Sequence, residues 1–570
     1  MTSLLTPTGV ESTTICQFST NVRPTPLPSS LRVLVPTSSS SSSRNVGSTS
    51  RLSCDYSIGI TTSSTTQKWI SRREARRVLR SYAVKGNKQQ EEVSILDDQK
   101  QAYAQSFVEQ FRASCATPLE RLLDVMDAMV AEFEAGLAED GKDLKMLPAF
   151  LETLPTGQEN GCFYALDLGG TNFRVLRARF GGEQGLLNQE AATYTIPHEL
   201  MLGENDDLFD FIAGKLGDFV ALEQELHHDA HRKRELGFTF SFPVQQHSIA
   251  SGTLIHWSKG FKVKGTVGRD IVAVLRDAIR RKGLDLEVAA LVNDTVGCLA
   301  EGRYNDKDVM MAVILGTGTN ACFVEEASAV PKWKGAPPAS GKHVINTEWG
   351  NLNSPTLPTT FADEELDRES VNPGDHIFEK LMSGMYLGEI VRLVILRMAQ
   401  EGGIFADYTT GRLSEKCSLP TPEVSKIHAD ESASLDAAGE ILSKVWGIPS
   451  TTLEERKIVL SIIEIVTQRG ARLAAAGIAA VLKKIGRFGG RIGNGNGNGN
   501  GATHGARTVV AIDGGLFTHY SQFRDYMLEA FEEILGKEAA SSVSIKLSRD
   551  GSGIGAVLLA ACHSKYRREH

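Results

Sequence analysis

Apolar residues recur at helical spacing early in the body of the chain. Between Leu119 and Phe133 they fall three and four residues apart, which is the i, i+3, i+4, i+7 pattern of a helix with one face packed on a core. The apolar positions between these two residues are Leu122, Leu123, Met126, Met129 and Val130. We predict a scaffold helix over this segment.

Beyond this segment, short apolar runs alternate with stretches of helical spacing. Such alternation predicts strands joined by helices, and therefore an α/β protein. The predicted strands are residues 162–168, 173–180, 236–240, 288–292, 310–315, 321–324 and 508–512.

Two pairs of these strands are joined by similar glycine turns. Residues 165–175 (ALDLGGTNFRV) form an apolar strand, a turn and a second strand, and residues 314–323 (ILGTGTNACF) repeat this form. Both turns contain Gly-Thr-Asn. Two hairpins of like construction predict a duplicated α/β unit whose turns face a shared ligand.

A glycine turn has two interpretations. Main-chain N–H groups without a neighbouring Cβ can bind phosphate oxygens, whereas a tight hairpin needs glycine only for positive φ. For one turn alone the hairpin interpretation is favoured, but two such turns favour phosphate binding. The sequence lacks a G-x-x-x-x-G-K-[S/T] motif and the H-R-D and D-F-G pair. The P-loop and protein-kinase routes to phosphate binding are therefore excluded.

Composition narrows the class of protein. The 570 residues are 41% hydrophobic and 23% charged, which predicts two or three globular domains. The net charge of −8 argues against nucleic-acid binding, and the lack of any run of 18 or more apolar residues predicts no membrane anchor. The eight cysteines occur singly, without a C-x-x-C motif, so we expect reduced thiols.

The N-terminal segment differs in composition from the rest of the chain. Residues 1–70 contain 30 Ser or Thr but only two acidic residues, and a run of five arginines follows at residues 72–80. This profile predicts a disordered organelle transit peptide over residues 1–83, with a plastid favoured over a mitochondrion. A merely disordered cytosolic tail is the alternative. The apolar stretch at residues 31–35 is too short for a secretory signal. Residues 486–505, rich in Gly and Asn, are predicted to form a flexible loop.

Several short motifs occur in the order and spacing of one family. They are residues 166–175 (LDLGGTNFRV), 236–243 (LGFTFSFP), 257–261 (WSKGF), 292–295 (VNDT), 346–350 (NTEWG), 372–374 (NPG), 513–515 (DGG) and 548–555 (SRDGSGIG). Each motif is weak alone. Together they span the chain from about residue 100 to residue 562, and they resemble the hexokinase family. With its N-terminal segment, the chain is most similar to a plant plastid-type hexokinase.

The resemblance implies an actin-like ATPase (ribonuclease H-like) duplicated α/β fold, with two domains that close over a cleft. It assigns 84–159 to an N-terminal helical part of the large domain, 160–292 to the small domain, 293–552 to the large domain and 553–570 to a helix that returns to the small domain. The two hinges would lie near Asn293 and Gly551. Closure driven by sugar would keep water from the phosphoryl group, so we expect weak ATPase activity without sugar.

The resemblance also implies the catalytic roles. Asp294 would be the general base that takes the proton of a hexose 6-hydroxyl as it attacks ATP, with Lys259 and Arg174 as the other catalytic residues. From the residues alone, Asn-Asp-Thr after an apolar strand is also a good helix N-cap, and both roles can coexist. The implied substrate-binding residues are Ser241, Phe242, Pro243, Ser258, Lys259, Asn293, Asp294, Asn320, Glu348 and Glu379.

Glu379 alone would more often be a solvated surface charge, whereas Glu348 beside Trp349 has a stronger reason to bind a hydroxyl group. On the nucleotide side, ATP would lie against both turns, and Asp167 would hold Mg²⁺ through water. The implied nucleotide-binding residues are Asp167, Gly169, Gly170, Thr171, Asn172, Arg174, Gly316, Thr317, Gly318, Asp513, Gly514 and Gly515.

Two other interpretations share this fold. A hexokinase-like sugar sensor would keep the fold and have weak or no catalysis, and a chaperone of the same superfamily would lack the sugar-binding set. Because Asp294, Lys259 and Arg174 are all present, an active enzyme of the first step of glycolysis is favoured. We expect a monomer in the plastid (chloroplast stroma), with hexose and MgATP as ligands and the plastid import machinery as partner of the N-terminal segment.

Overall fold

The computed structural model describes residues 32–34, 58–61, 68–70, 99–222, 233–257, 260–488, 507–548 and 550–566. The chain divides into two units, Met1–Gln99 and Lys100–His570. In the first unit, β1 (Arg32–Leu34), β2 (Ile58–Thr61) and β3 (Lys68–Ile70) pair as an antiparallel sheet. Apart from these three short strands, which the prediction of a disordered segment did not include, the predictions for residues 1–83 and for the Gly/Asn loop beyond residue 488 concern residues outside those described.

The second unit contains a five-stranded sheet of order β11-β8-β5-β6-β7. Strands β5, β6 and β7 form an antiparallel meander, while β8 pairs parallel with β5 and β11 parallel with β8. Their bounds are Asn160–Leu168 (β5), Asn172–Gly181 (β6), Leu186–Thr195 (β7), Arg234–Phe240 (β8) and Leu286–Val292 (β11).

The second sheet of this unit repeats the same pattern. Strands β12, β13 and β14 form an antiparallel meander, β15 pairs parallel with β12, and β16 pairs parallel with β15. Their bounds are Val309–Leu315 (β12), Thr319–Glu326 (β13), Lys342–Asn346 (β14), Thr508–Asp513 (β15) and Val543–Leu547 (β16). Only the edge strand β4 (Leu147–Pro148), which pairs with β14, has no counterpart in the first sheet. The predicted duplication is therefore confirmed.

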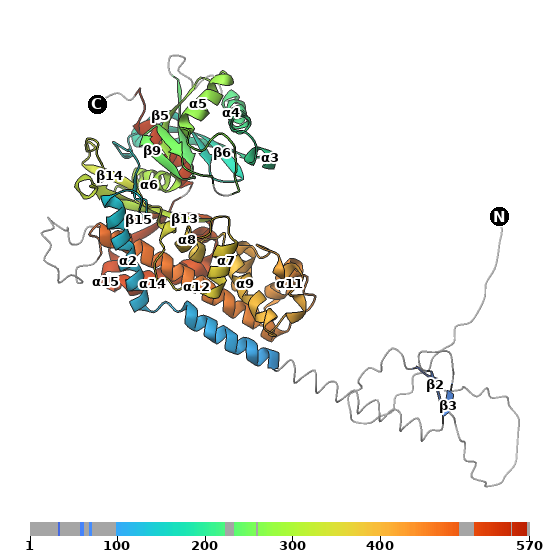
Figure 1. Ribbon diagram of the computed structural model, residues 1–570. Coiled ribbons are helices and arrows are strands. Elements are labelled where there is room, and N and C mark those ends of the chain that lie inside the picture. The colour runs from blue at the N-terminus through green and yellow to red at the C-terminus, as the bar shows by residue number, and fades with distance from the viewer. Residues whose placement is uncertain are drawn as a thin grey trace, which may run out of the picture. The chain divides into compact units, whose positions relative to one another are not determined.

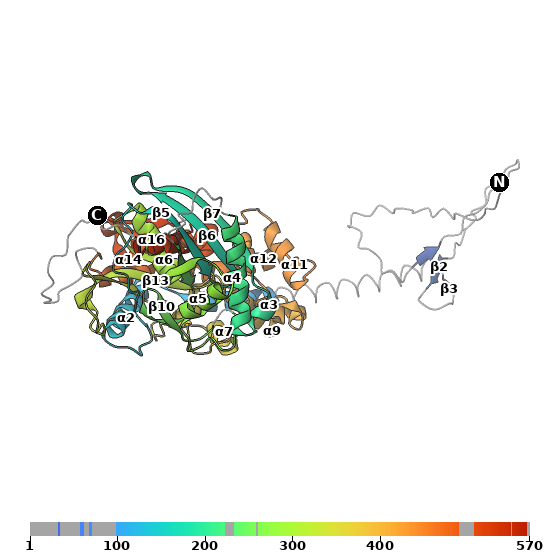
Figure 2. The same ribbon diagram turned by 90° about the horizontal axis from the view of Figure 1, so that it is seen from above.

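One helix follows the last strand of each sheet in the chain, and these two helices pack against each other. Helix α6 (Asp294–Asn305) follows β11, and α16 (Gly551–Cys562) follows β16. The two helices cross closely at glycines, because a Cβ on Gly297 would lie 2.9 Å from the Ser552 carbonyl oxygen. Helix α16 also packs on β5 and β8 of the first sheet, beside α6 in Figure 2. The paired helices and the facing sides of both sheets form one hydrophobic core.

Some of the remaining helices pack against the sheets, and others pack on one another away from the sheets (Figure 1). Helices α4 (Asn205–Ala221) and α5 (Ile271–Arg281) pack together with the first sheet in one core. The larger core holds α2 (Leu119–Ala138), α9 (Leu387–Gln400), α12 (Leu453–Lys484) and α14 (Ser521–Leu535). The other helices of this half are the described helix at 99–115, α7 (Phe361–Glu369), α8 (Ile377–Met382), α10 (Thr421–His428), α11 (Asp436–Trp446), α13 (Gly515–His519) and α15 (Lys537–Ser541).

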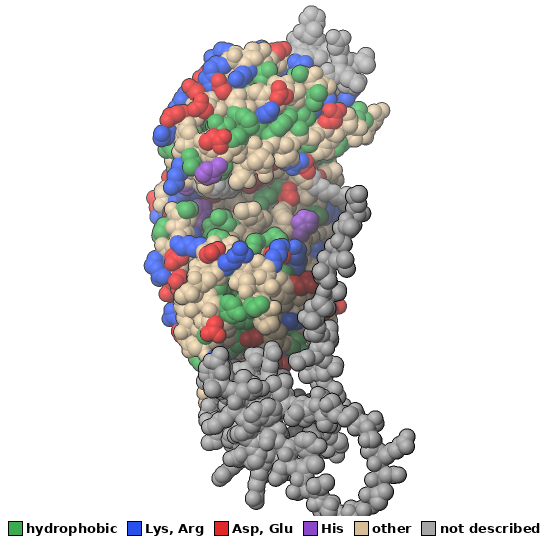
Figure 3. Space-filling view, turned by 90° about the vertical axis from the view of Figure 1, so that its right-hand side faces the viewer, with side chains coloured by type: hydrophobic (Ala, Val, Ile, Leu, Met, Phe, Trp, Pro, Cys, Tyr) green, Lys and Arg blue, Asp and Glu red, His purple; other side chains and the backbone are tan. Residues whose placement is uncertain are grey.

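Helix α12 is long and apolar enough, by length and composition, to cross a membrane. Within its most apolar stretch, however, 89% of the residues are buried inside the protein. Its apolar character is therefore explained by a central place in the larger core. On the face drawn in Figure 3, acidic and basic side chains are interspersed over the surface.

Every strand predicted from an apolar run is present, with bounds that differ by a few residues. The predictions missed β7, where the side chains are mostly exposed and the residues largely polar. They also missed β9 (Val244–Ser248), β10 (Ser251–Leu254), β14 and β16. The predicted domain boundaries and hinges remain predictions.

Candidate active site

Asp294 lies at the start of α6, where the strand β11 ends. Asn293 is the N-cap residue, and its side-chain oxygen accepts a hydrogen bond of 3.0 Å from the Thr295 N–H. The Asp294 carboxylate accepts a second hydrogen bond from the same N–H at 2.8 Å. The capping interpretation of Asn-Asp-Thr is thus confirmed for Asn293, and it leaves one oxygen of Asp294 for other partners.

Glu348 lies across from α6, after β14. Its carboxylate oxygen Oε1 accepts hydrogen bonds from the Asn346 side chain at 2.8 Å and from the Asn320 side chain at 3.3 Å. Its backbone is in the left-handed region, with φ of 53°, which costs energy for a residue other than glycine. Burial raises the pKa of Glu348, the Asn346 hydrogen bond opposes this, and the Asp294 charge raises it further. The structure therefore brings Asn320, Glu348 and Asp294 together.

Glu379, at the start of α8, lies next to the second glycine turn. Its Oε2 accepts a hydrogen bond of 2.9 Å from the Thr319 N–H. A Cβ on Gly318 would lie 2.5 Å from the same oxygen, so the carboxylate fits only because residue 318 is glycine. Glu379 is also close enough to Glu348 to raise the pKa of that group. It is not the solvated surface charge that its sequence context alone would favour.

The segment after β8 brings further predicted residues to this place. Ser241 begins it, with its N–H donating to the Leu168 carbonyl at 3.2 Å, and the Pro243 carbonyl accepts the Ile255 N–H at 3.0 Å. Phe242 is buried among Phe240, Trp257 and Phe261. Of the predicted sugar-binding residues, Ser258 and Lys259 lie outside the described residues.

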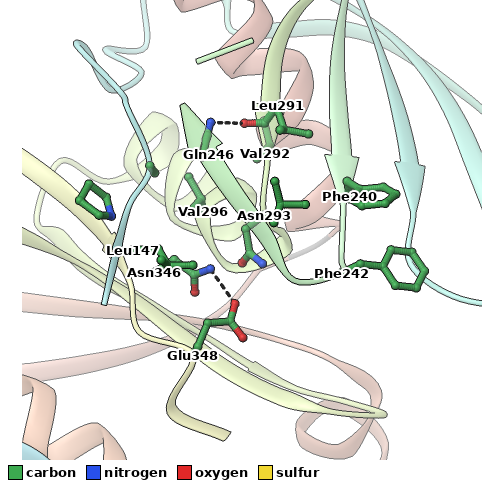
Figure 4. A pocket seen from close by; sticks show the side chains of 13 residues that line it. Leu147, Phe240, Phe242, Gln246, Leu291, Val292, Asn293, Val296, Asn346 and Glu348 are labelled. Atoms are coloured by element: carbon green, nitrogen blue, oxygen red, sulfur yellow. Dashed lines mark hydrogen bonds between the residues drawn. The ribbon is translucent and has the colours of Figure 1, made fainter. Parts of the chain in front are cut away.

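A cavity opens beside these residues, between the ends of both sheets (Figure 4). Its polar lining includes Asn293, Glu348, Asn346 and Gln246, and the Gln246 amide is held by a hydrogen bond of 3.1 Å to the Leu291 carbonyl. The rest of the lining is apolar, from Leu147, Phe240, Phe242, Leu291, Val292 and Val296 among others. A few convergent polar groups on apolar walls are typical of a small-molecule site.

Asp167 lies at the end of β5, opposite Arg174 on β6. Ser552, in the first turn of α16, donates a hydrogen bond of 2.8 Å to its carboxylate. Burial raises the pKa of Asp167 to about 6, and the charges of Asp294 and Asp550 add to this effect against the Ser552 and Arg174 interactions. A half-buried carboxylate with two other acidic side chains nearby is suited to a cation.

Arg174 makes a bidentate ion pair with Asp550. The two guanidinium nitrogens donate to the two carboxylate oxygens at 2.6 and 2.7 Å. Asp550 precedes α16, with φ of 62°, and also accepts a hydrogen bond of 3.2 Å from the Gln189 amide. Arg174, a predicted catalytic residue, is thus held in place by the residue that precedes α16.

Asp513 ends β15 and faces the start of α16. Its carboxylate accepts hydrogen bonds from the Gly514 N–H at 2.6 Å and from the Gly551 N–H at 3.0 Å. Burial raises its pKa against these two bonds, and the Asp550 and Asp294 charges raise it further. Gly514 has φ of 117°, and Gly515 begins α13.

Neither predicted turn has a glycine at positive φ, so the hairpin interpretation does not account for them. In the first turn, a Cβ on Gly170 would meet no atom within 4 Å, and Thr171 and Asn172 are exposed. In the second, Thr317 is exposed, and the Gly316 and Thr317 carbonyls accept the N–H groups of Gly384 and Met385 at 2.8 and 3.0 Å. Gly169 lies near Ser241 and Asp167. The first turn has room for an anion at Gly170, whereas the space beside Gly318 in the second turn is occupied by the Glu379 carboxylate.

Asp294 is close enough to influence both the residues around Glu348 and the residues around Asp167. Its charge raises the pKa of Glu348 on one side and of Asp167 and Asp513 on the other. The structure describes no cluster of three or more His, Cys, Asp or Glu side chains at metal-ligand spacing in the ranges given above.

Three residues of this site were not predicted from the sequence. Asn346 bonds to Glu348, Asp550 pairs with Arg174, and Ser552 donates to Asp167. All three fall within or beside the quoted motifs. Asp550 and Ser552 have partners that are distant in the sequence, and Asn346 bonds to Glu348, whose backbone is strained. The spacing of residues along the chain therefore did not predict these roles.

Comparison with known proteins identifies the family. Residues 107–304 and 310–562 each match a family model described as hexokinase. The chain is 52% identical over 459 residues to Hexokinase-1 of Spinacia oleracea, covering 80% of this chain and 90% of that protein. It is 51% identical to Hexokinase-2 of Oryza sativa subsp. japonica, covering 81% and 92%.

A solved structure, the hexokinase from Schistosoma mansoni complexed with glucose, superposes with a TM-score of 0.71 at 32% identity. The match covers 80% of this chain and 99% of that one. A second hexokinase crystal structure gives a TM-score of 0.67 at 30% identity. The duplicated two-sheet fold and these matches agree, and the chain belongs to the hexokinase family.

Proposed function

We propose that this chain transfers the γ-phosphoryl group of ATP to the 6-hydroxyl of a hexose, giving hexose 6-phosphate and ADP. Glucose would be a substrate, with fructose and mannose also accepted. The observation that supports the proposal is the position of Asp294 between two groups of side chains. On one side lie polar side chains of the kind that bind sugar hydroxyl groups, namely Asn320, Glu348 and Glu379. On the other side lie Asp167 and Arg174, which are suited to Mg²⁺ and phosphate.

Asp294 has the properties of a general base for this reaction. One carboxylate oxygen is held by the Thr295 N–H, so the group is oriented while the other oxygen can accept a proton. The hydroxyl oxygen of the sugar would attack the γ-phosphorus as its proton passes to Asp294. Asn293, Asn320, Glu348 and Glu379 would bind the other hydroxyl groups, each of which is both donor and acceptor.

Arg174 and the two turns would receive the nucleotide phosphates, and Asp513, Gly514 and Gly515 would lie along the adenosine. Asp167 fits Mg²⁺ held through water, because its half-buried carboxylate lies near other acidic groups. When bound, Mg²⁺ would offset the charge that develops on the phosphates. The proposed roles of Ser258 and Lys259 are supported by the motif alone.

The alternative is a sugar sensor with weak or no catalysis. The retained Asp294 and Arg174, and their placement, favour the enzyme. The full chain would be incubated with MgATP, with and without glucose, and ADP and sugar phosphate would be measured. We expect turnover that depends on sugar and weak ATPase activity without it. Glucose binding without any sugar phosphate would favour the sensor.

We further propose that residues 1–83 are a plastid transit peptide, with the mature enzyme in the chloroplast stroma as a monomer without a membrane anchor. The Ser-rich, Arg-rich and acid-poor composition supports this proposal. A fluorescent protein fused to residues 1–83 should enter plastids in plant cells. Mitochondrial or cytosolic fluorescence would contradict the proposal, and accumulation only with residues 1–83 present would identify the import signal.

A further inference from the structure

Three side chains near the proposed sugar site form a chain of hydrogen bonds with a fixed direction. The Asn320 amide donates to the Asn346 side-chain oxygen at 2.8 Å. The Asn346 amide in turn donates to Glu348 Oε1 at 2.8 Å (Figure 4). Asn320 also reaches Glu348 directly, at the longer distance of 3.3 Å. Asn346 is therefore the stronger of the two donors to this carboxylate.

The backbone around Asn346 does not need its side chain. Asn346 pairs with Cys322 in the β13–β14 ladder and with Leu147 of β4. The next residue, Thr347, is held by its N–H and its hydroxyl group, both of which donate to the Ala321 carbonyl at 2.9 and 2.8 Å. The side-chain amide of Asn346 therefore bonds to other side chains of the site and does not take part in the strand pairing.

Among the residues that the structure describes, Asn320 is the only other side chain that donates to the Glu348 carboxylate. Glu348 is in the left-handed region, and Asn351 donates only to its backbone carbonyl, at 3.2 Å. The charges of Asp294 and Glu379 lie near it and disfavour its ionised form. His376, which also faces it, favours that form when protonated. A hydrogen-bond donor on the carboxylate is therefore needed to keep it ionised and in one orientation.

We propose that Asn346 is a positioning residue for sugar binding, which aims the Glu348 carboxylate at a hydroxyl group of the hexose by donating one hydrogen bond to Oε1 and accepting one from Asn320. This assignment rests on the proposed function. Asn346 itself is 7% exposed, and it acts through Glu348 rather than on the reacting atoms.

The test compares Asn346→Leu with Asn351→Leu in the full chain. Both changes remove an amide that bonds to Glu348, but Asn351 bonds to the backbone. Asn346→Leu should raise the Kd and KM for glucose by about 10-fold to 100-fold, the usual worth of a hydrogen bond to a charged group, with a smaller change in kcat. Asn351→Leu should change them less than about 3-fold. Equal effects of the two variants would overturn the assignment.

A second background separates positioning from general packing. In Glu348→Ala, adding Asn346→Leu should raise the glucose Kd by less than about 3-fold, because the carboxylate that Asn346 holds is absent. Full additivity of the two changes would show that Asn346 acts elsewhere. If wild-type protein does not bind glucose at all, the proposed function fails. If it binds, and Asn346→Leu binds equally well, only the positioning role fails.

Asn346→Asp covers the case in which Asn346→Leu does not fold. It keeps the size of the side chain but faces Glu348 with a second carboxylate. Glucose affinity should fall strongly at pH 8 and recover as the pH is lowered toward 6, because one proton shared by the pair restores a donor. Wild-type affinity should change little over this range. A pH-independent loss in Asn346→Asp would contradict the assignment.

Discussion

The two helices that follow the last strand of each sheet begin in different ways. Helix α6 is capped by its own sequence, since Asn293 and Asp294 both accept the Thr295 N–H. Helix α16 is capped from elsewhere: Asp513 accepts the Gly551 N–H, and Asp167 accepts the Ser552 hydroxyl group. Its own Asp550 turns away to Arg174. One topology, used twice, thus produces two helix starts of different chemistry.

The difference between the two helix starts agrees with their proposed roles, in which α6 contributes to the sugar site and α16 to the nucleotide site. The α6 start presents a carboxylate toward the residues of sugar-binding type. Helix α16 has no acidic residue in its first turn, which contains Gly551, Ser552 and Gly553. Ser552 bonds to Asp167, and the preceding Asp550 pairs with Arg174. A negative group at a helix start suits a base, whereas glycine and serine leave space for phosphate. The same topology therefore carries different residues at its two helix starts.

The largest expected effect is at the α6 start. Asp294→Ala should lower kcat by about 10²-fold to 10⁴-fold, the range for losing a general base, with glucose binding largely kept. Asp270 is a matched control, because it caps α5 through the Val272 and Ala273 N–H groups away from the site. Asp270→Ala should cost about 1 kcal/mol of stability and leave kcat unchanged. Initial rates and thermal melts measure both, and similar rates for the two variants would refute the base assignment.

Asp167 should show opposite effects on function and stability. Its pKa in the folded protein is raised to about 6 from 3.8, so its ionisation destabilises the fold increasingly as the pH rises from about 4 to 6. Asp167→Asn should therefore gain up to about 3 kcal/mol at pH 7, and nothing at pH 4, while turnover with MgATP falls strongly. Denaturation at both pH values measures the gain. A variant destabilised at pH 7 would show that burial is not the dominant influence on Asp167.

Asp550 should affect the nucleotide and not the sugar. Asp550→Asn breaks the bidentate pair and leaves Arg174 less well oriented, so we expect kcat/KM for MgATP to fall about 10-fold. The glucose Kd should stay within 2-fold of wild type. Arg507→Gln breaks an ion pair with Asp306 that lies outside the proposed site, and it should leave both quantities unchanged.

The smallest effect is expected at Ser552. Ser552→Ala removes the hydrogen bond that favours ionised Asp167, so the pKa of Asp167 should rise further above about 6. The KM for MgATP should rise about 3-fold at pH 6.5, where Mg²⁺ competes with the proton, and little at pH 8. Ser552→Thr, which keeps the hydroxyl group, should restore the wild-type profile. An effect of equal size at both pH values would point to packing instead.

The same contrast shows what the sequence could predict. Asn293 and its cap were predictable because the partners are two residues apart, and the hairpins were predictable because apolar runs flank each glycine turn. The Ser552–Asp167 and Arg174–Asp550 pairs join residues 385 and 376 positions apart. Spacing along the chain carries no information about such pairs. The partly polar β7 and the short β14 and β16 were missed because exposed or short strands lack a continuous apolar run.

The central claim is that the α6 start serves the sugar and the phosphoryl transfer, whereas the α16 start serves the nucleotide. It is tested most directly by titrating glucose and MgADP separately into Asp294→Ala and Asp550→Asn in a calorimeter. We predict that Asp550→Asn weakens MgADP binding about 10-fold with unchanged glucose binding, and that Asp294→Ala keeps its affinity for MgADP within about 2-fold. Loss of glucose binding in Asp550→Asn, or unchanged MgADP binding in that variant, would contradict the division.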